Sequence, residues 1–180
     1  MNIEMLGLTG SLIINKEVKS DIRGNFYKSY ASDELRRNGT DFDVKEIFYS
    51  TSSKNVVRGM HFQVPPFEQA KLVNVVKGNI TDVLLDLRVN SESCGKFVSL
   101  NLSEYDGKTL YIPRGIAHGF VSRSIESIVL YAVDSPYSML SEGGIRYDSF
   151  GYDWRVENPI LSDRDRSFIQ FDGFMSPFKL

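Results

Sequence analysis

The chain is poor in the residues that build disulfide frameworks and metal clusters. Its 180 residues include one cysteine, Cys94, and two histidines, His61 and His118. A lone cysteine excludes a disulfide within the chain and suits a reducing compartment. We therefore expect a cytoplasmic protein in which Cys94 is a partly buried loop residue.

An excess of charge of one sign and long apolar runs are also absent. Acidic and basic residues nearly balance, and the formal net charge is −2. The sequence has no basic cluster typical of nucleic-acid binding. No stretch approaches the roughly 18 consecutive apolar residues of a membrane span, and the N-terminal residues lack the pattern of a signal peptide. We thus expect neither nucleic acid nor a membrane as a partner.

What the chain has is a composition suited to a folded core. Hydrophobic residues make up 42% and charged residues 24% of the sequence, which is ordinary for a globular protein. We find no internal repeat, low-complexity tract or linker. The length and this continuity predict one domain over residues 1–180.

Runs of β-branched and aromatic residues, bounded by turn residues, predict strands along much of the chain. The predicted strands cover residues 44–51, 71–77, 79–88, 96–103, 109–112 and 127–133. Short helices are predicted over Ser32–Arg37, which Asn38-Gly39 would end, and around 162–166. Closely spaced strands indicate an all-β fold, an antiparallel sandwich or barrel with a few short peripheral helices.

Side-chain alternation marks two of these strands. Asp82, Asp86 and Arg88 share one face of their strand, with apolar residues behind them. Such a face suits the polar interior of a ligand-holding barrel, and an ordinary half-exposed strand has the same pattern. By the same rule Tyr131 lies opposite Leu130, so it faces either a cavity or the core.

Both histidines lie in segments punctuated by glycine and proline, residues 58–63 and 110–120. We expect them at the mouth of the barrel, where an imidazole can transfer protons or bind a metal. The spacing from Gly107 through Pro113 to His118 resembles the second sequence motif of the cupin superfamily. This resemblance implies a cupin jelly-roll barrel but not its chemistry.

A metal site is the less favoured interpretation of the two histidines. Metal-binding cupins supply His-x-His and a Glu from their first motif, whereas this chain reads His61-Phe62-Gln63, with Glu68 beyond Pro65-Pro66. One imidazole is therefore missing, and the prolines interrupt the strand that would align the carboxylate. Two histidines and a carboxylate can still form a facial triad. We nevertheless predict that the site holds no metal.

Proton transfer needs a base with a pKa near neutrality, an acid on the opposite face of the substrate and a cation for the developing negative charge. His61 has a suitable ordinary pKa. Tyr131 carries its proton at neutral pH and can donate it within a hydrogen bond. Lys71 can stabilise an enolate oxygen. The spacing of these three residues does not show whether they converge.

Several motifs together resemble the dTDP-4-dehydrorhamnose 3,5-epimerase family. They are Arg58-Gly59-Met60-His61-Phe62-Gln63, Gln69-Ala70-Lys71-Leu72-Val73, the segment from Gly78 to Arg88, Ser91 with Gly95-Lys96, and the block from Ile112 to Phe120. Their order and gaps agree from about Arg23 to Asp165. The resemblance implies a homodimeric jelly-roll enzyme without a metal or organic cofactor, acting on a nucleotide-diphosphate 4-keto-6-deoxy sugar for surface polysaccharide.

The resemblance also implies roles for individual residues. His61 would be the base, Asp165 (rather than the nearby Asp163) its orienting carboxylate, and Tyr131 the acid. Lys71 would lie near the keto oxygen. Arg58 and His118 would line the sugar–diphosphate pocket, and Gln63 would also bind substrate. Tyr137 and Glu142 would lie on the nucleotide side, Lys28 and Tyr49 near the base or sugar, and Arg23 and Phe26 would reach the partner subunit's site.

This chain departs from the family at two places, and both bear on the substrate. Family members usually carry Gln and Asn where this chain has Ile47-Phe48-Tyr49-Ser50, and Glu where it has Lys28. A GDP-linked sugar or a 4-keto-heptose could therefore replace the thymidine-linked sugar as substrate. Inversion at C3, C5 or both stays open. The barrel is also compatible with a sugar-nucleotide 3,4-ketoisomerase, a metal-dependent dioxygenase or a non-catalytic sugar-binding cupin.

Overall fold

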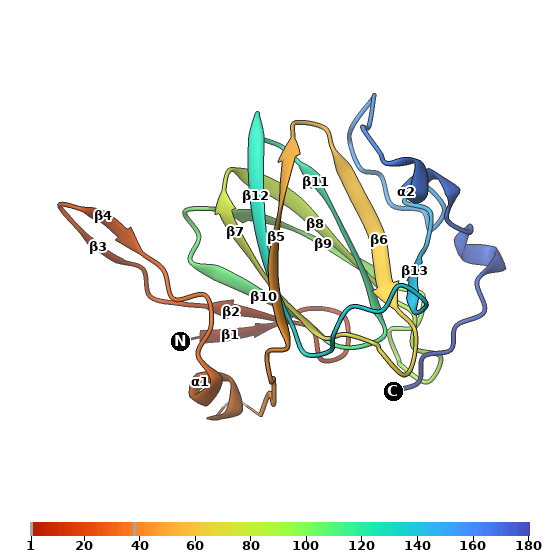
Figure 1. Ribbon diagram of the computed structural model, residues 1–180, viewed down its shortest axis with the longest axis horizontal. Coiled ribbons are helices and arrows are strands. Elements are labelled where there is room, and N and C mark those ends of the chain that lie inside the picture. Colours follow the sequence, from red (N-terminus) through yellow and green to blue (C-terminus); the bar gives the residue numbers. More distant parts are fainter. Residues whose placement is uncertain (1, 38) are drawn as a thin grey trace.

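Two antiparallel sheets face each other in the computed structural model, which describes residues 2–37 and 39–180 (Figure 1). The first sheet contains, in spatial order, β1 (Asn2–Met5), β2 (Leu12–Asn15), β10 (Lys108–Ile112), β7 (Lys71–Lys77), β12 (Glu126–Val133) and β5 (Glu46–Ser53). The second contains β13 (Glu142–Gly144), β6 (Val57–Gln63), β11 (Ile116–Ser122), β8 (Asn79–Asp86) and β9 (Phe97–Ser103). This arrangement confirms the predicted jelly roll.

The remaining elements lie around this sandwich. A hairpin of β3 (Lys19–Asp21) and β4 (Gly24–Phe26) projects away from the barrel (Figure 1). The short helix α1 (Ser32–Arg37) lies beside the edge of the first sheet formed by β1 and β2 (Figure 1). The C-terminal part contributes α2 (Asp163–Ser167) and the 3-10 turn η1 (Phe171–Gly173). No helix among the described residues has the length and apolar character needed to cross a membrane.

Hydrophobic side chains fill the space between the sheets and also cover the second sheet from outside. Leu84 and Phe120 meet Val73 of the first sheet in the interior. On the outer face, Val83 packs in a cluster with Trp154 from the C-terminal segment. Full burial of one such side chain contributes about 1.5–3 kcal/mol. Because both faces of the second sheet are covered, its strands form a firm support for side chains that point inward.

The six predicted strands are confirmed with ends within two residues, and the segment 71–77 matches β7 at both ends. The helix Ser32–Arg37 is confirmed, and Gly39 follows it with a φ of 78°; Asn38 lies outside the described residues. The predicted helical turn is α2, one residue further along. Cys94 does lie in a loop, but it is exposed rather than partly buried.

The expected position of the two histidines at the barrel mouth was wrong. His61 lies within β6 and His118 within β11, so both belong to the barrel wall. Every residue of β11 is buried, which removes the alternation by which a half-exposed strand is recognised. In β6 an irregularity beside Gly59 breaks the alternation.

The predicted polar barrel interior holds for Asp82 but not for Asp86 and Arg88. Asp86 accepts hydrogen bonds from Arg88 Nη2 at 2.7 Å and from the hydroxyls of Ser91 and Ser93 at 2.7 and 2.6 Å. These residues form a buried polar cluster apart from the pocket described below, with a role in holding the loop after β8.

Candidate active site

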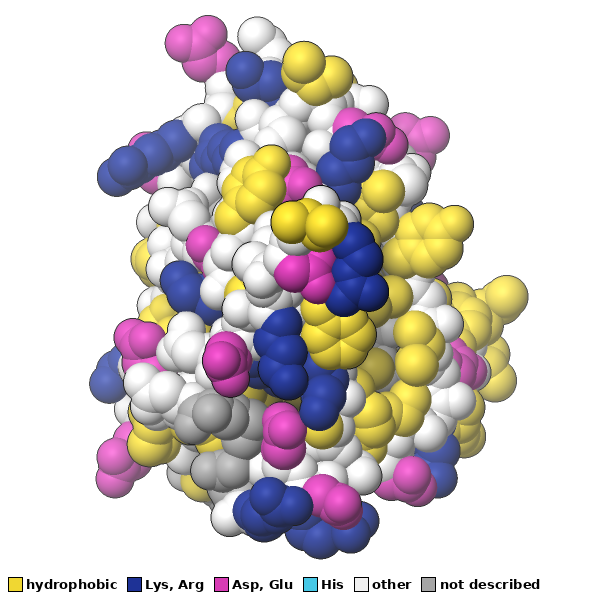
Figure 2. Space-filling model, turned by 90° about the vertical axis from the view of Figure 1, so that its left-hand side faces the viewer, with side chains coloured by type: hydrophobic (Ala, Val, Ile, Leu, Met, Phe, Trp, Pro, Cys, Tyr) yellow, Lys and Arg dark blue, Asp and Glu magenta, His cyan; other side chains and the backbone are white. Residues whose placement is uncertain are grey.

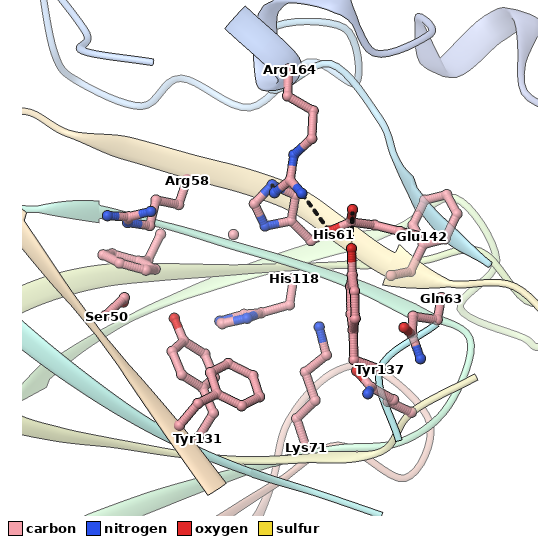
Figure 3. Close-up of a pocket in the computed structure, with 15 residues that line it drawn as sticks. Ser50, Arg58, His61, Gln63, Lys71, His118, Tyr131, Tyr137, Glu142 and Arg164 are labelled. Atoms are coloured by element: carbon pink, nitrogen blue, oxygen red, sulfur yellow. Dashed lines mark hydrogen bonds and ion pairs between the residues drawn. The ribbon is translucent and has the colours of Figure 1, made fainter. Parts of the chain in front are cut away.

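A pocket of about 260 Å³ lies between the two sheets and contains most of the predicted site residues (Figure 3). It is lined by Arg58, His61, Gln63, Lys71, His118, Tyr131, Tyr137 and Glu142, and further by side chains that include Phe48, Ser50 and Arg164. His61 comes from the second sheet, whereas Lys71 and Tyr131 come from the first. The base and the acid predicted from the sequence thus face one common space.

A bulge in β6 lets Arg58 and His61 line the same pocket. Strict alternation would place residues three apart on opposite faces. In the pairing of β6 with β11, however, Arg58 to His61 spans the same distance as the two-residue step from Phe120 to His118. A Cβ added to Gly59, which has a φ of 132°, would lie 2.5 Å from the Cα of Gly119. A side chain larger than hydrogen therefore does not fit at the bulge, a device that re-aims side chains at functional sites.

The His61 imidazole forms a pair with Asp165, which α2 carries into the site. His61 Nε2 lies 3.0 Å from Asp165 Oδ1, and the backbone N–H of Gly59 donates to Oδ2 at 3.0 Å. Ser162 caps α2 and donates its hydroxyl to Oδ1 at 2.9 Å. Burial alone raises the pKa of Asp165, but these hydrogen bonds, that of His61 foremost, lower it to about 2. Asp165 is therefore an ionised acceptor near neutral pH.

Because an ionised carboxylate only accepts, the hydrogen of neutral His61 is assigned to Nε2. The other ring nitrogen, Nδ1, points toward the pocket interior (Figure 3). Burial lowers the pKa of His61 below its ordinary value; Asp165 raises it, and Lys71 and Arg164 lower it further. The imidazole is thus neutral near pH 7, with an unprotonated nitrogen facing the cavity.

His118 forms a second histidine–aspartate pair deeper in the same pocket. Its Nε2 lies 2.8 Å from Oδ2 of Asp82, and both side chains are buried. Burial raises the pKa of Asp82, while His118 and Lys71 oppose the rise. Oδ1 of Asp82 is buried without a hydrogen-bond partner among the described residues. His118 lies near Lys71 and Tyr131 in the pocket, and its ring centroid is 6.0 Å from that of Tyr131 (Figure 3).

Lys71 is a buried cation in the pocket. Burial lowers its pKa to about 8, against the raising influence of Asp82 and Glu142. The side chain therefore keeps its charge near pH 7 and loses it in mildly alkaline solution. A buried ammonium group of this kind can stabilise an oxyanion strongly, because little water screens it.

Tyr131 presents its phenol to the pocket next to Ser50 (Figure 3). Burial raises its pKa well above the ordinary value, Asp82 adds to the rise, and Ser50 and Arg58 oppose it. The phenol therefore stays protonated across the physiological range. Its ring stacks on Phe48, with centroids 5.0 Å apart and ring planes 18° from parallel, which fixes its direction.

Tyr137, Glu142 and Arg164 line the pocket and contact one another, and Gln63 supports the loop that carries Tyr137 (Figure 3). Tyr137 donates its hydroxyl to Glu142 Oε2 at 3.1 Å, and Glu142 Oε1 forms an ion pair with Arg164. The side-chain amide of Gln63 donates hydrogen bonds to the carbonyls of Phe67 and Pro136. Its oxygen accepts a hydrogen bond from the N–H of Ser138 at 2.7 Å. Gln63 thus holds the Tyr137 loop in place.

Four predicted substrate-binding residues lie outside the pocket. Arg23 and Phe26 belong to the projecting hairpin, where they are exposed. Lys28 is exposed and faces Glu34 at 3.8 Å. Tyr49 is 68% exposed, because the alternation of β5 turns Phe48 and Ser50 inward and Tyr49 outward. Tyr49 therefore lies outside this pocket, and its neighbours Phe48 and Ser50 line it.

Sequence reasoning also missed Arg164 and gave Asp82 no role. Arg164 precedes Asp165, but on a five-residue helix no periodic pattern predicts which way its side chain points. Among the described residues, no three His, Cys, Asp or Glu side chains are arranged to hold a metal ion. Gln63 stands where the first cupin motif has its second histidine, and its side chain bonds to the loop residues Phe67, Pro136 and Ser138.

Comparisons with known proteins agree with this geometry. The family model for dTDP-4-dehydrorhamnose 3,5-epimerase matches residues 5–172. A dTDP-4-dehydrorhamnose 3,5-epimerase of Shigella flexneri is 36% identical over 181 residues, covering 97% of this chain and 100% of that protein. One of Methanothermobacter thermautotrophicus is 37% identical over 166 residues, 89% of each chain.

A solved structure of an epimerase resembles this chain over nearly its whole length. The crystal structure of dTDP-6-deoxy-D-glucose-3,5-epimerase from Legionella pneumophila, in complex with dTDP-4-keto-L-rhamnose, superposes with a TM-score of 0.92 at 30% identity. The match covers 97% of this chain and 94% of that one. The protein therefore belongs to the dTDP-4-dehydrorhamnose 3,5-epimerase family, a family of isomerases.

Proposed function

We propose that this epimerase inverts carbon atoms next to the ketone of a dTDP-linked 4-keto-6-deoxy sugar without a metal or organic cofactor. The observation that carries the proposal is the convergence of His61, Lys71 and Tyr131, from two facing sheets, on one pocket (Figure 3). The thymidine nucleotide is supported by the family model and by the sugar nucleotide bound in the Legionella relative.

The proposed reaction begins with proton removal. Nδ1 of His61 takes a proton from a carbon beside the ketone; the electron pair of that C–H bond forms a carbon–carbon double bond to C4, and the π pair of the carbonyl moves to its oxygen. The resulting enolate oxygen lies near the ammonium group of Lys71, which stabilises its charge. Asp165 holds the imidazole in the required tautomer and stabilises the imidazolium that forms.

Inversion follows when a proton returns from the opposite face. Tyr131 donates its phenolic hydrogen to the carbon, and the carbonyl double bond reforms. His61 has then gained one proton and Tyr131 has lost one, so exchange with solvent resets both groups. C3 and C5 both flank the ketone at C4, so one base and one acid can serve either centre in turn.

The test is incubation of the protein in D2O with dTDP- and GDP-linked 4-keto sugars, followed by proton NMR. We expect deuterium at C3, C5 or both and inversion at the labelled carbon, with the dTDP sugar preferred. Migration of the ketone to C3 would show a ketoisomerase, and absence of exchange with every sugar would show a binding protein. Either result would overturn the proposal, as would activity that requires added metal. A preference for a GDP-linked sugar or a heptose would overturn the nucleotide or sugar assignment alone.

We further propose that the working unit is a homodimer in which each hairpin reaches the partner's site. Three observations support this. The hairpin projects from the barrel (Figure 1); Arg23 and Phe26 are exposed at 86% and 61%; and hydrophobic side chains are exposed among charged ones on that side of the molecule (Figure 2). A guanidinium there matches the geometry of a diphosphate. The dimer would work in the cytoplasm, which suits a chain with one free cysteine.

Mixing two inactive variants tests the shared site. Arg23→Gln removes the positive charge from the β3–β4 hairpin, and His61→Asn removes the proposed base. If each site uses Arg23 from the partner's hairpin, a mixed dimer has one site with both His61 and Arg23 intact, and the mixture regains activity. A mixture that stays inactive, or a monomer in sedimentation, would contradict the shared site.

A further inference from the structure

Arg164, at the pocket opening, contacts the predicted base and its carboxylate together. Its Nη2 lies 3.5 Å from Nε2 of His61, and its Nε lies 3.7 Å from Oδ1 of Asp165. The guanidinium also forms an ion pair with Glu142 of β13 (Figure 3). It lies over the ring of Phe168, 5.9 Å from the ring centroid. These contacts hold the charge in a defined position although the side chain is half exposed.

The contact between Arg164 and His61 is electrostatic and not a hydrogen bond. The hydrogen on Nε2 of His61 is directed to Asp165, and a guanidinium can only donate. Two donors therefore face each other. When the ring accepts a proton at Nδ1 it becomes positive, and a fixed positive charge lies beside it.

Charged groups face His61 from each element packed around it. From α2 come Asp165 and Arg164, from β7 comes Lys71, and from β13 comes Glu142, which Arg164 pairs. Across the strand pair lies His118, whose partner is Asp82 of β8. Asp165 favours the imidazolium, while the two cations and burial disfavour it. Without Arg164, both Asp165 and an unpaired Glu142 would favour protonation.

We propose that Arg164 is a positioning residue for the base: held by Glu142 beside the Asp165 edge of His61, it keeps the imidazole unprotonated and ready to accept a substrate proton. This inference rests on the proposed function only where it concerns the rate. Its electrostatic part concerns the free protein. Asp165 fixes the tautomer and direction of the ring, but its negative charge also favours protonation of His61. The positive charge of Arg164 opposes that effect.

The direct test is NMR titration of the imidazoles in the wild type, Arg164→Gln, Arg164→Lys and Arg166→Gln. The chain has two histidines, so a His61→Asn variant assigns both signals. Arg166→Gln is the matched control, because it removes the same charge from an exposed position on the same helix. A charge at this distance shifts a pKa by one unit or more when buried, and solvent reduces the effect, so we expect an upward shift of about half to one unit for His61 in Arg164→Gln.

The companion measurement is the pH dependence of kcat/KM for deuterium exchange. In Arg164→Gln the acidic limb should move up by the same amount as the His61 titration, so that the rate falls roughly three- to tenfold below the midpoint and recovers above it. Arg164→Lys should restore most of the profile, and Arg166→Gln should leave it unchanged.

Two results would overturn the inference. One is an unmoved His61 titration in a folded Arg164→Gln variant. The other is a loss of rate that is uniform across pH, which a merely structural role would give. If the titration shifts as expected but no variant, including the wild type, catalyses exchange, the proposed function fails while the electrostatic role of Arg164 stands.

Discussion

The two histidines that line the pocket each pair with an aspartate, at similar distances but in different surroundings. His61 and Asp165 are 3.0 Å apart, and His118 and Asp82 are 2.8 Å apart. The His61 side chain keeps 26% of its exposure, whereas that of His118 keeps 4%. Separation between the two groups therefore does not identify the base.

The two carboxylates differ most. Asp165 receives hydrogen bonds from a backbone N–H, a hydroxyl and an imidazole, and its pKa falls to about 2. Asp82 receives one from His118, leaves an oxygen unpaired among the described residues, and has a pKa raised by burial. A base needs a carboxylate that is reliably ionised behind it. The comparison therefore supports the proposal that His61 removes the proton, with His118 as a fixed part of the pocket wall near Lys71.

The largest effect should separate the two histidines. We expect His61→Asn to abolish deuterium exchange, a loss of about 10²- to 10⁴-fold or more, because the general base is gone. His118→Asn should weaken substrate binding and retain measurable exchange. Exchange kinetics on both folded variants decide this, and the reverse order of damage would move the base to His118.

Replacing the two aspartates should slow deuterium exchange less than replacing the base, and the change at Asp165 should cost more than the change at Asp82. Asp165→Asn should lower the exchange rate by roughly 10²-fold or more, since the amide can present a hydrogen instead of an acceptor to Nε2. Asp82→Asn should cost less and should shift the alkaline limb of the pH profile downward, because Asp82 raises the pKa of Lys71. Equal losses in the two variants, with no shift of the limb, would remove the distinction drawn above.

The pH profile itself sharpens the comparison. His61 must be neutral, so activity should rise as pH increases through its pKa, which lies below the ordinary 6.5. Lys71 must be charged, so kcat/KM should fall as pH increases above about 8. Tyr131 stays protonated throughout. In Lys71→Arg the charge persists at higher pH, so the alkaline limb should disappear; a limb that remained near pH 8 would assign it to another group.

The smallest expected effect concerns the ring that supports the acid. Phe48→Asn removes a stacking partner of Tyr131, an interaction worth about 0.5–1.5 kcal/mol, so inversion should slow by roughly two- to tenfold. Ile47→Asn is the matched control, because Ile47 lies on the same strand and is 63% exposed. Equal rates in the two variants would show that Phe48 does not position the phenol.

The sequence predicted six strands and the short helix Ser32–Arg37 well, because runs of β-branched and aromatic residues and a capping residue are local signals. It failed for β6 and β11, where glycines interrupt the strand pattern: Gly119 lies within β11, and Gly59 lies at the bulge of β6. The same bulge brings Arg58 and His61 to one pocket. A strict period of two excludes that arrangement.

The candidate site was predictable where motif and residue type coincide, as for His61, Lys71 and Tyr131. The sequence did not predict that Phe48 and Ser50, rather than Tyr49, line the pocket, because a shift of one residue in strand parity exchanges the two faces. Arg164 has no sequence signal, since its importance comes from α2 docking against β6 across about a hundred residues of chain. Such contacts follow from tertiary packing and not from local pattern.

The most direct test of the account is the fate of substrate in D2O with the Tyr131→Phe variant. The claim is that a base from one sheet and an acid from the other act on opposite faces of the same ring. We predict that this variant labels the carbon beside the ketone with deuterium, because His61 still removes the proton, and returns it without inversion. Full inversion at the wild-type rate would contradict the claim and leave Tyr131 a structural side chain.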